Sequence, residues 1–467
     1  MNSFLENFFK LEERQTNWRR EVIGGITTFV TMSYIIFVNP QIMAAAGMEA
    51  GAVMIATCLA TAVGTLFMAL YANAPLAQAP VMGVNAFFAY TLCGSMGYTW
   101  EQGLGAVLLS GFLLLIISVT GLRKKIIEEI PFYLKKAIGI GIGFFILYIG
   151  LKNADLLSFT AGAGSFELVD GSARISGGII PSLNFGSDTA LLSLLGVLLN
   201  LIFLLRDTRG GILLSMVLTS VIGCLLQFFC GWQLGITLPG AMPIGNIDDV
   251  FGKALTGFVQ LFDISQGIGP MLVSLVVVAI TLTFADLFNT IGMILATVSK
   301  ANMIDEQGNI VGSERMLVSD AVATVLGAII GTSTVSIYVE SSAGIATGAR
   351  TGLASVVTAA LFAVSVVLAP LLGLVPVAAT APVLIIVGIL MAAEIGDIDW
   401  RNMDVAVPSY FTIVMMCFGY NIADGIAFGF IMFCFVQLVR GRFNEVTWLI
   451  RILTALFLLR FAIMLTY

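Results

Sequence analysis

Histidine is absent from the 467 residues, and only 11% of them are charged, compared with about 25% in an average soluble protein. Without imidazole the chain lacks the most adaptable acid–base group and metal ligand of proteins. The six cysteines lie in apolar stretches and form no CxxC pair, which favours small apolar side chains over a metal or disulfide site. Neither HExxH nor GxSxG occurs, so we expect no enzyme activity, no metal and no cofactor. A net charge of −6 argues against nucleic acid as a partner.

The sequence is rich in long apolar runs. Hydrophobic residues make up 58% of the chain, and the mean hydropathy is +1.01. Runs near about 18 residues predict an all-α polytopic membrane protein, because open sheets leave backbone groups unsatisfied in lipid. The first half has seven predicted segments at 22–43, 52–71, 81–93, 104–120, 132–151, 190–206 and 210–230. The second half also has seven, at 270–297, 316–331, 336–348, 352–370, 376–395, 405–419 and 422–440.

Basic residues support this arrangement of fourteen segments. With the N-terminus in the cytoplasm, 17 of the 22 lysines and arginines fall inside and only Lys152, Arg174 and Lys253 fall outside. The other two, Arg451 and Arg460, lie in a last apolar stretch, 446–464, which is either interfacial or a further span. The first 20 residues are charged, so we expect no cleavable signal peptide. The loops 152–189 and 231–269 are predicted to be external connectors.

The two sets of seven have opposite orientations and matching interruptions. The stretches ANAPLAQAPVMGVNAFFAY (72–90) and GTSTVSIYVESSAGIA (331–346) each place a short polar or Pro/Gly segment before a short helix. Paired interrupted segments in two halves are typical of a transporter with inverted repeats and a binding site near the bilayer midplane. Two unrelated short helices are the alternative.

Isolated acids in apolar segments give the clearest functional signal. Asp286, Asp320 and Glu340 have no cation near them in sequence, and no basic residue is assigned to the interior of the fourteen segments. A charge at the bilayer centre costs about 2.5–3.5 kcal/mol on insertion scales. Each acid is therefore expected to hold a proton, bind a cation, or accept hydrogen bonds from a ligand or from polar neighbours. The first two solutions favour an ion-coupled carrier, whereas the third includes a structural role between helices.

Polar and aromatic side chains accompany the acids. Asn289 follows Asp286 by one helical turn, and Asn85 occupies the place in the first short helix that Glu340 occupies in the second. An amide both donates and accepts hydrogen bonds. With Phe284 and Tyr338 as aromatic faces, the set indicates a flat substrate with polar edges.

Four motifs resemble those of the AzgA-like purine permeases, a branch of the nucleobase–cation symporter-2 (nucleobase–ascorbate transporter) family. They are GGITTFVTMSYIIFVNPQI (24–42), GVNAFFAY (83–90), FADLFNTIG (284–292) and STVSIYVESSAGIATGARTG (333–352). The resemblance extends over nearly the whole chain. It implies a plasma-membrane importer of adenine, guanine or hypoxanthine, driven by proton symport through alternating access, with Na⁺ as the alternative coupling ion. No partner besides the base and the lipid bilayer is implied, except a second copy bound through the gate domain.

The resemblance also implies a domain plan with short strand–helix segments at positions 3 and 10. The divisions are a cytoplasmic N-terminus (1–21), a core domain (22–122 and 270–370), a gate domain (123–230 and 371–440), an external connector (231–269) and a C-terminal helix (441–467).

The resemblance assigns roles to individual residues. Glu340 matches the family's glutamate in segment 10, Asp286 and Asp320 match its aspartates in segments 8 and 9, and Asn85 matches its asparagine in segment 3. Asn289 departs from the pattern, because relatives carry a second acid there. The expected substrate-binding residues are Glu340, Asn289, Asn85, Phe284, Tyr338 and Thr27. The expected proton-coupling residues are Asp286, Glu340 and Asp320.

Rival readings stay open at this point. A carrier on the same fold could transport another nucleobase or an anion such as sulfate or bicarbonate, although lone carboxylates without intramembrane cations disfavour an anion. A channel or a non-transporting receptor is a further alternative.

Overall fold

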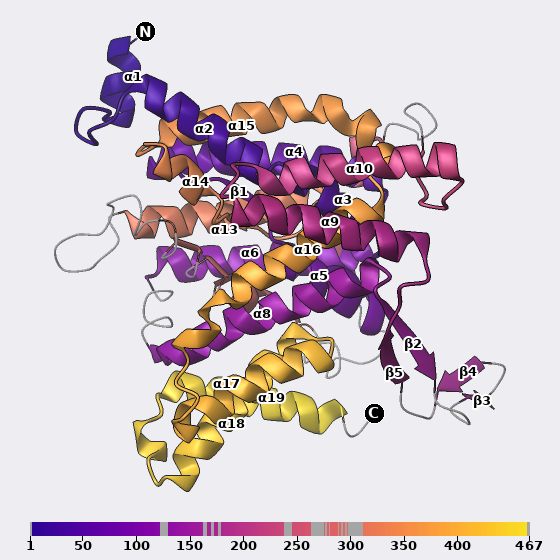
Figure 1. The fold of residues 1–467 in the computed structure, drawn as a ribbon. Helices are drawn as coiled ribbons and strands as arrows, with labels where there is room; N and C mark the ends of the chain where they lie inside the picture. Colours follow the sequence, from indigo (N-terminus) through magenta and orange to yellow (C-terminus); the bar gives the residue numbers. More distant parts are fainter. Residues whose placement is uncertain are drawn as a thin grey trace.

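The computed structural model describes residues 2–121, 129–161, 166–169, 172–175, 179–237, 245–262, 281–287, 289–290 and 312–464, with Leu275, Val278, Ala279, Met293, Ile294 and Thr297. Long helices run side by side between two ends of the molecule (Figure 1). Within the described residues, eight helices are long and apolar enough to cross a membrane, and three shorter apolar helices accompany them. The prediction of a mostly helical, multi-pass membrane protein is confirmed.

The first half of the chain is described up to α11. Its helices are α1 (Asn2–Phe9), α2 (Trp18–Met32), α3 (Ile35–Ala44), α4 (Ala50–Phe67), the π-helix η1 (Met68–Ala72), α5 (Met82–Ala86), the π-helix η2 (Phe87–Ser95), α6 (Trp100–Val119), α8 (Phe132–Asn153), α9 (Asp188–Leu205), α10 (Gly211–Cys230), η3 (Ile247–Asp249) and α11 (Lys253–Gln260). Its strands are β1 (Gln78–Pro80), β2 (Leu157–Ala161), β3 (Phe166–Val169), β4 (Ser172–Ile175) and β5 (Ile179–Leu183).

The second half begins with a helical stretch that includes 281–287 and 289–290; the rest of the predicted segment 270–297 lies largely outside the described residues. The elements that follow are α13 (Ser313–Ile330), β6 (Val335–Ile337), α14 (Ser341–Ala346), α15 (Gly352–Val364), η5 (Ser365–Leu374), α16 (Val377–Ala392), η6 (Ala393–Asp397), α17 (Met403–Phe418), α18 (Ile422–Val439), η7 (Phe443–Glu445) and α19 (Trp448–Met464). The stretch 446–464 therefore forms a helix, which packs against α18.

The two halves meet through a short sheet. Strand β1 pairs with β6 in antiparallel register, so that Gln78 faces Ile337 and Pro80 faces Val335. Both strands are buried, and each leads into a short helix, α5 or α14. The pairing satisfies backbone groups that would otherwise be unpaired at membrane depth. It also brings two segments that are remote in sequence to one place.

The first predicted segment is two helices rather than one. Helix α2 ends at Met32, and α3 begins at Ile35. Across the break, the amides of Ile36 and Phe37 donate three residues back, to the carbonyls of Ser33 and Tyr34. The turns form without glycine or proline, and the Tyr34 hydroxyl within them contacts Glu340 of the second half.

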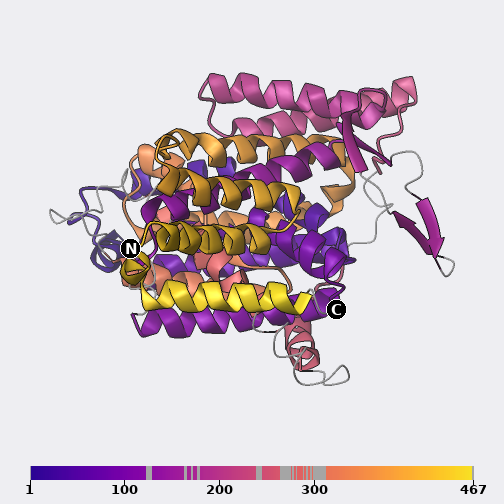
Figure 2. The same cartoon turned by 90° about the horizontal axis from the view of Figure 1, so that it is seen from below.

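Glycines allow close helix contacts along α8. A Cβ atom added at Gly143 would lie 2.8 Å from Met391 Cβ, and one at Gly150 would lie 2.9 Å from the Ile385 nitrogen. Helix α8 therefore packs closely on α16, as is usual for small residues between membrane helices. Figure 2 shows α9 and α10 as a pair along one side of the molecule, with α11 on the opposite side.

The two long loops contain secondary structure that the sequence did not indicate. Between α8 and α9, β2 pairs with β5 and β3 pairs with β4, both antiparallel. These hairpins project from one end of the molecule (Figure 1). In the second loop, α11 packs on α6, where a Cβ at Gly257 would lie 1.7 Å from the Glu101 carbonyl oxygen. The prediction of simple connectors therefore missed these elements.

Candidate functional site

Glu340 lies where α14 begins. It is the N-cap residue of α14, and its own side chain makes no capping hydrogen bond. The side chain is half-buried, and Tyr34 Oη donates to Glu340 Oε1 at 2.5 Å. Tyr34 itself is fully buried. The break between α2 and α3 therefore supplies a hydroxyl donor to the one predicted site acid that keeps partial exposure.

Asn85 lies in a buried hydrogen-bond cluster. It is fully buried; Ser333 Oγ donates to Asn85 Oδ1, and Asn85 Nδ2 donates to Asn39 Oδ1 at 2.5 Å. Asn39 Nδ2 in turn donates to the hydroxyls of Thr57 and Thr332, at 2.7 and 3.0 Å. The cluster joins α3, α4 and α5 to the residues before β6. Both ends of the Asn85 amide are therefore bonded to protein.

The predicted equivalence of Asn85 and Glu340 is wrong in detail. Val81 is the N-cap residue of α5, so Asn85 lies inside that helix, whereas Glu340 begins α14. The reason is local. After β6 the chain makes an extra turn, in which the Ser341 amide donates to the Tyr338 carbonyl before the helix starts.

Asp286 and Asp320 share a second buried network, and both are fully buried. Thr290 Oγ1 lies 2.7 Å from Asp320 Oδ2 and 3.4 Å from Asp286 Oδ1. Ser336 Oγ donates to Asp320 Oδ1 at 2.6 Å, and Thr324 Oγ1 donates to Asp286 Oδ2 at 3.1 Å. Hydroxyl groups thus link the two carboxyls to each other and to β6. Asp320 lies in the middle of α13 rather than near its start, because the helix begins earlier than predicted.

Asn289 presents an unused donor. Its side chain is 7% exposed, and no described residue accepts a hydrogen bond from Nδ2. A buried amide without a partner loses about 1–3 kcal/mol of solvation that a ligand could restore. Asn289 directly precedes Thr290, whose hydroxyl lies 2.8 Å from Ser336 Oγ on β6. The backbone at Asn289 is therefore close to β6, the strand that precedes Glu340 in sequence.

The remaining predicted site residues lie around the same elements. Phe284 and Tyr338 are 8% and 6% exposed, and Tyr338 Oη donates to the Pro80 carbonyl at 2.5 Å. Thr27 is half-buried on α2, and its hydroxyl donates back to the Ile23 carbonyl at 2.8 Å. Tyr338 thus ties β6 to β1, while the Thr27 hydroxyl is used within its own helix.

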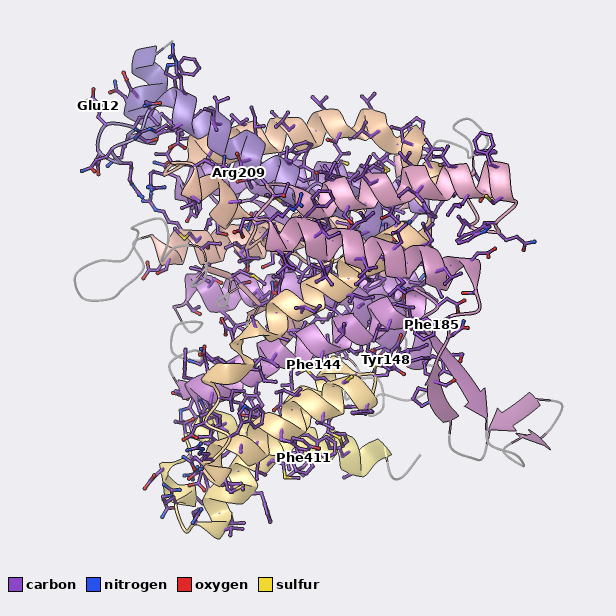
Figure 3. All side chains as sticks on the ribbon, viewed as in Figure 1. Glu12, Phe144, Tyr148, Phe185, Arg209 and Phe411 are labelled. Carbon is purple, nitrogen blue, oxygen red and sulfur yellow. The ribbon has the colours of Figure 1, made fainter. Side chains whose placement is uncertain are left out.

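Charged clusters lie at helix ends, away from these networks. Lys136 at the start of α8 pairs with Asp397, and Arg440 and Arg442 after α18 both pair with Asp404. The Arg440 hydrogen bond, together with that from Arg442, holds the pKa of the Asp404 carboxyl below its usual value. The labelled side chains give the two ends of the molecule: Glu12 lies at one end, and Phe185 near the hairpins lies at the other (Figure 3).

Sequence reasoning missed the hydrogen-bond partners of the acids and of Asn85. Tyr34, Asn39, Thr290 and Ser336 make the contacts described above, yet none was singled out. A signal was present for Asn39, an amide in the apolar run YIIFVNP. Hydroxyl residues carry a weaker signal, because serine and threonine are common in membrane helices and bond to their own backbone.

Known proteins match this chain over most of its length. A model described as "Permease family" (Xan_ur_permease) matches residues 19–428. A putative permease of Methanocaldococcus jannaschii is 40% identical over 98% of both chains. The adenine permease AdeP of Escherichia coli is 36% identical over 98% of this chain and 95% of its own, and the guanine/hypoxanthine permease PbuG of Bacillus subtilis is 36% identical over 95% and 96%.

Among solved structures, the transmembrane domain of the cyanobacterial bicarbonate transporter BicA aligns with a TM-score of 0.61, at 16% identity, over 87% of this chain and 96% of that chain. This likeness concerns the fold alone. Together, the apolar helices and the matches place the chain among the membrane permeases. The chain belongs to the permease family whose model spans residues 19–428, and the resemblance to the purine permeases of the nucleobase–cation symporter-2 group is confirmed.

Proposed function

We propose that this chain imports a purine base (adenine, guanine or hypoxanthine) across the plasma membrane by proton symport. The names of the adenine and guanine/hypoxanthine permeases above support the substrate class. The observations that carry the proposal are a half-buried acid, Glu340, directly before α14, and a buried amide donor, Asn289, that has no described partner. A purine edge presents both the donors and the acceptors that such a pair requires.

In the bound state the Glu340 carboxylate accepts a hydrogen bond from a ring N–H, and Asn289 Nδ2 donates to a ring nitrogen or carbonyl. Tyr34 holds the carboxylate in place. Phe284, Tyr338 and Thr27 form walls around the ring. Asn85 acts through its cluster, which fixes α5 against the residues before β6.

Proton coupling in this proposal uses Glu340, Asp286 and Asp320. The hydroxyls of Thr290, Thr324 and Ser336 link the two aspartates, so a change at one carboxyl alters the hydrogen bonds available to the other. Because Ser336 lies on β6, the network is connected through the backbone to Glu340. Substrate binding and proton binding can then influence each other.

Alternating access in this proposal uses fourteen segments in two inverted repeats, with the N-terminus in the cytoplasm. The core domain contains β1, β6 and the polar networks, and it moves against a gate domain formed by 123–230 and 371–440. The packing of α8 on α16, α17 and α18 supports one coherent gate domain. A homodimer formed through this domain is part of the proposal.

The direct test is uptake of labelled adenine, guanine and hypoxanthine into cells that lack their own purine permeases. We expect saturable accumulation of at least one base, which a protonophore collapses. No uptake of any base by well-expressed protein would overturn the purine assignment, and accumulation that requires sodium would replace the proton. Unlabelled sulfate and bicarbonate serve as competitors, and effective competition by either would favour an anion carrier.

A further inference from the structure

A cavity of about 260 Å³ lies between α3 and η2 on one side and α8 and α16 on the other. We call it the α3–α16 cavity. Its wall includes Val38, Gln41, Tyr90, Asn153, Thr380 and Ala381. Asn153 ends α8, directly before the hairpins, so the cavity lies toward that end of the molecule. Neither Glu340 nor Asn289 lines it.

The cavity shares one face of α3 with the Glu340 site. Val38 and Gln41 follow Tyr34 by four and seven residues, spacings that place side chains on the same side of a helix. At 1.5 Å per residue, Gln41 lies about 10 Å along the axis from Tyr34. Tyr34 contacts Glu340, so the cavity is in line with that site and roughly two helical turns from it.

The chemistry of the wall suits a flat heterocycle. Val38 and Ala381 are apolar, and Tyr90 supplies an aromatic ring. Two amides provide donors and acceptors. A volume of about 260 Å³ is slightly below the range of about 300–1,000 Å³ typical of sites for drug-sized molecules, which fits a smaller ligand.

The polar groups of the wall bond across the boundary between the two sides. Gln41 Nε2 donates to the Val375 carbonyl at 2.9 Å, and Thr380 Oγ1 donates to Gln41 Oε1. Asn153 Nδ2 donates to Tyr90 Oη at 3.0 Å. A ligand with its own donors and acceptors could replace these bonds at little net cost, because one hydrogen bond is exchanged for another.

We infer that the α3–α16 cavity is a second, weaker binding subsite for the transported base, occupied before or after the Glu340 site. This inference rests on the proposed function for the identity of the ligand. While the base occupies the cavity, it replaces the hydrogen bonds that Gln41 makes to Val375 and Thr380, so the contact between α3 and α16 weakens. Occupancy of the cavity is thereby coupled to movement of α3 relative to α16.

The test is equilibrium binding of labelled adenine, hypoxanthine and guanine to the purified full chain in nanodiscs. We expect two bases per chain for the unmodified protein and one for Glu340→Gln, because that variant keeps the weaker subsite. Ala381→Phe fills the cavity and should also leave one base per chain. The matched control Ile389→Phe adds the same ring to α16 at an exposed position and should leave two.

One base per chain for the unmodified protein, with none for Glu340→Gln, would overturn the subsite while leaving the proposed function intact. Binding of no base at all would instead overturn the proposed function. If Ala381→Phe fails to fold, as judged by size-exclusion chromatography, Val38→Phe fills the cavity from the opposite wall and carries the same expectation. Two bases per chain in a folded cavity-filled variant would also refute the subsite.

Discussion

The two short strand–helix segments have the same construction and treat their polar residues differently. In β1–α5, Asn85 is fully buried, and both ends of its amide are bonded to protein. In β6–α14, Glu340 is half-buried, and the one side chain bonded to its carboxylate is Tyr34 among the residues that the structure describes. The segments are paired strand to strand, so they share one environment.

Under the proposed function, this difference separates a structural role for Asn85 from a binding role for Glu340. A saturated polar cluster fixes the packing of its helices, because breaking any bond leaves a buried group unsatisfied. A partly satisfied acid at a helix start retains the capacity to bind something else. The same reasoning separates Asn289, whose Nδ2 has no acceptor among the described residues, from Asn39, whose Nδ2 donates to two hydroxyls. Substitutions of Glu340 and Asn289 should therefore reduce substrate affinity, whereas substitutions in the Asn85 cluster should reduce stability.

The largest effect is expected for Glu340→Gln. The neutral amide removes a charged acceptor, and hydrogen bonds to charged groups contribute about 1.5–3 kcal/mol, so apparent affinity in uptake should fall about 10- to 100-fold. Thermal unfolding should change little. Glu13→Gln is the control, since Glu13 is an exposed acid paired with Lys10. Unchanged uptake by Glu340→Gln would contradict a substrate-binding role for the β6–α14 segment.

Asn85→Ala should fail mainly through stability. The change strips partners from Ser333 and Asn39, and a buried unsatisfied group costs about 1–3 kcal/mol. We expect a lower unfolding temperature in detergent, with apparent affinity nearly preserved in the protein that does fold. Asn444→Ala, at an exposed position, should be silent. A normal unfolding temperature with lost affinity would reverse the comparison and make Asn85 a ligand contact.

Asn289→Asp introduces the second acid that the family resemblance implies at this position. It removes the Nδ2 donor and adds a titratable group, so we expect apparent affinity to fall about 2- to 10-fold and uptake to depend more steeply on external pH. Uptake measured across a pH series tests this. Asn289→Thr, which stays neutral, should weaken uptake without steepening the profile. If Asn289→Asp and the unmodified chain show the same dependence of uptake on pH, the residue type at this position has no effect on coupling.

The smallest effect is expected for Asp404→Asn, outside both short segments. Arg440 and Arg442 hold the pKa of Asp404 below its usual value. The ion pairs therefore stabilise the fold fully at any pH above the usual pKa of an aspartate. This stabilisation is lost as the pH falls through the lowered pKa of the folded protein. The variant should unfold at a slightly lower temperature at neutral pH, and the difference should vanish in acid. Its uptake should be normal. Altered substrate affinity would show that charge changes act on the site from a distance.

The sequence predicted the elements that hydrophobicity and isolated charge determine. Long apolar runs became helices, and the interruptions at 72–90 and 331–346 became the paired strands with their short helices. The acids Asp286, Asp320 and Glu340 stood out because nothing nearby in sequence neutralises them. These features are local, so a single sequence contains them.

Features that depend on distant partners could not be predicted. The break between α2 and α3 has no glycine or proline to indicate it. Its structural consequence is the contact of Tyr34 with Glu340, a residue 306 positions away. The hydroxyl network around Asp320 joins three separate elements. The hairpins after α8 and the packing of α11 on α6 occur in stretches whose composition indicated only loop. Tertiary pairing, rather than local preference, determines each of these.

The pairing of β1 with β6 also constrains how the protein is made. During synthesis β1 enters the membrane long before its partner exists, because Gln78 must wait for Ile337. Until then its backbone groups need a temporary partner, either water in a cavity or the insertion machinery. A chain interrupted between the two halves would leave each half with one unpaired strand at membrane depth. Two separately produced halves should therefore be degraded when alone and stable when produced together.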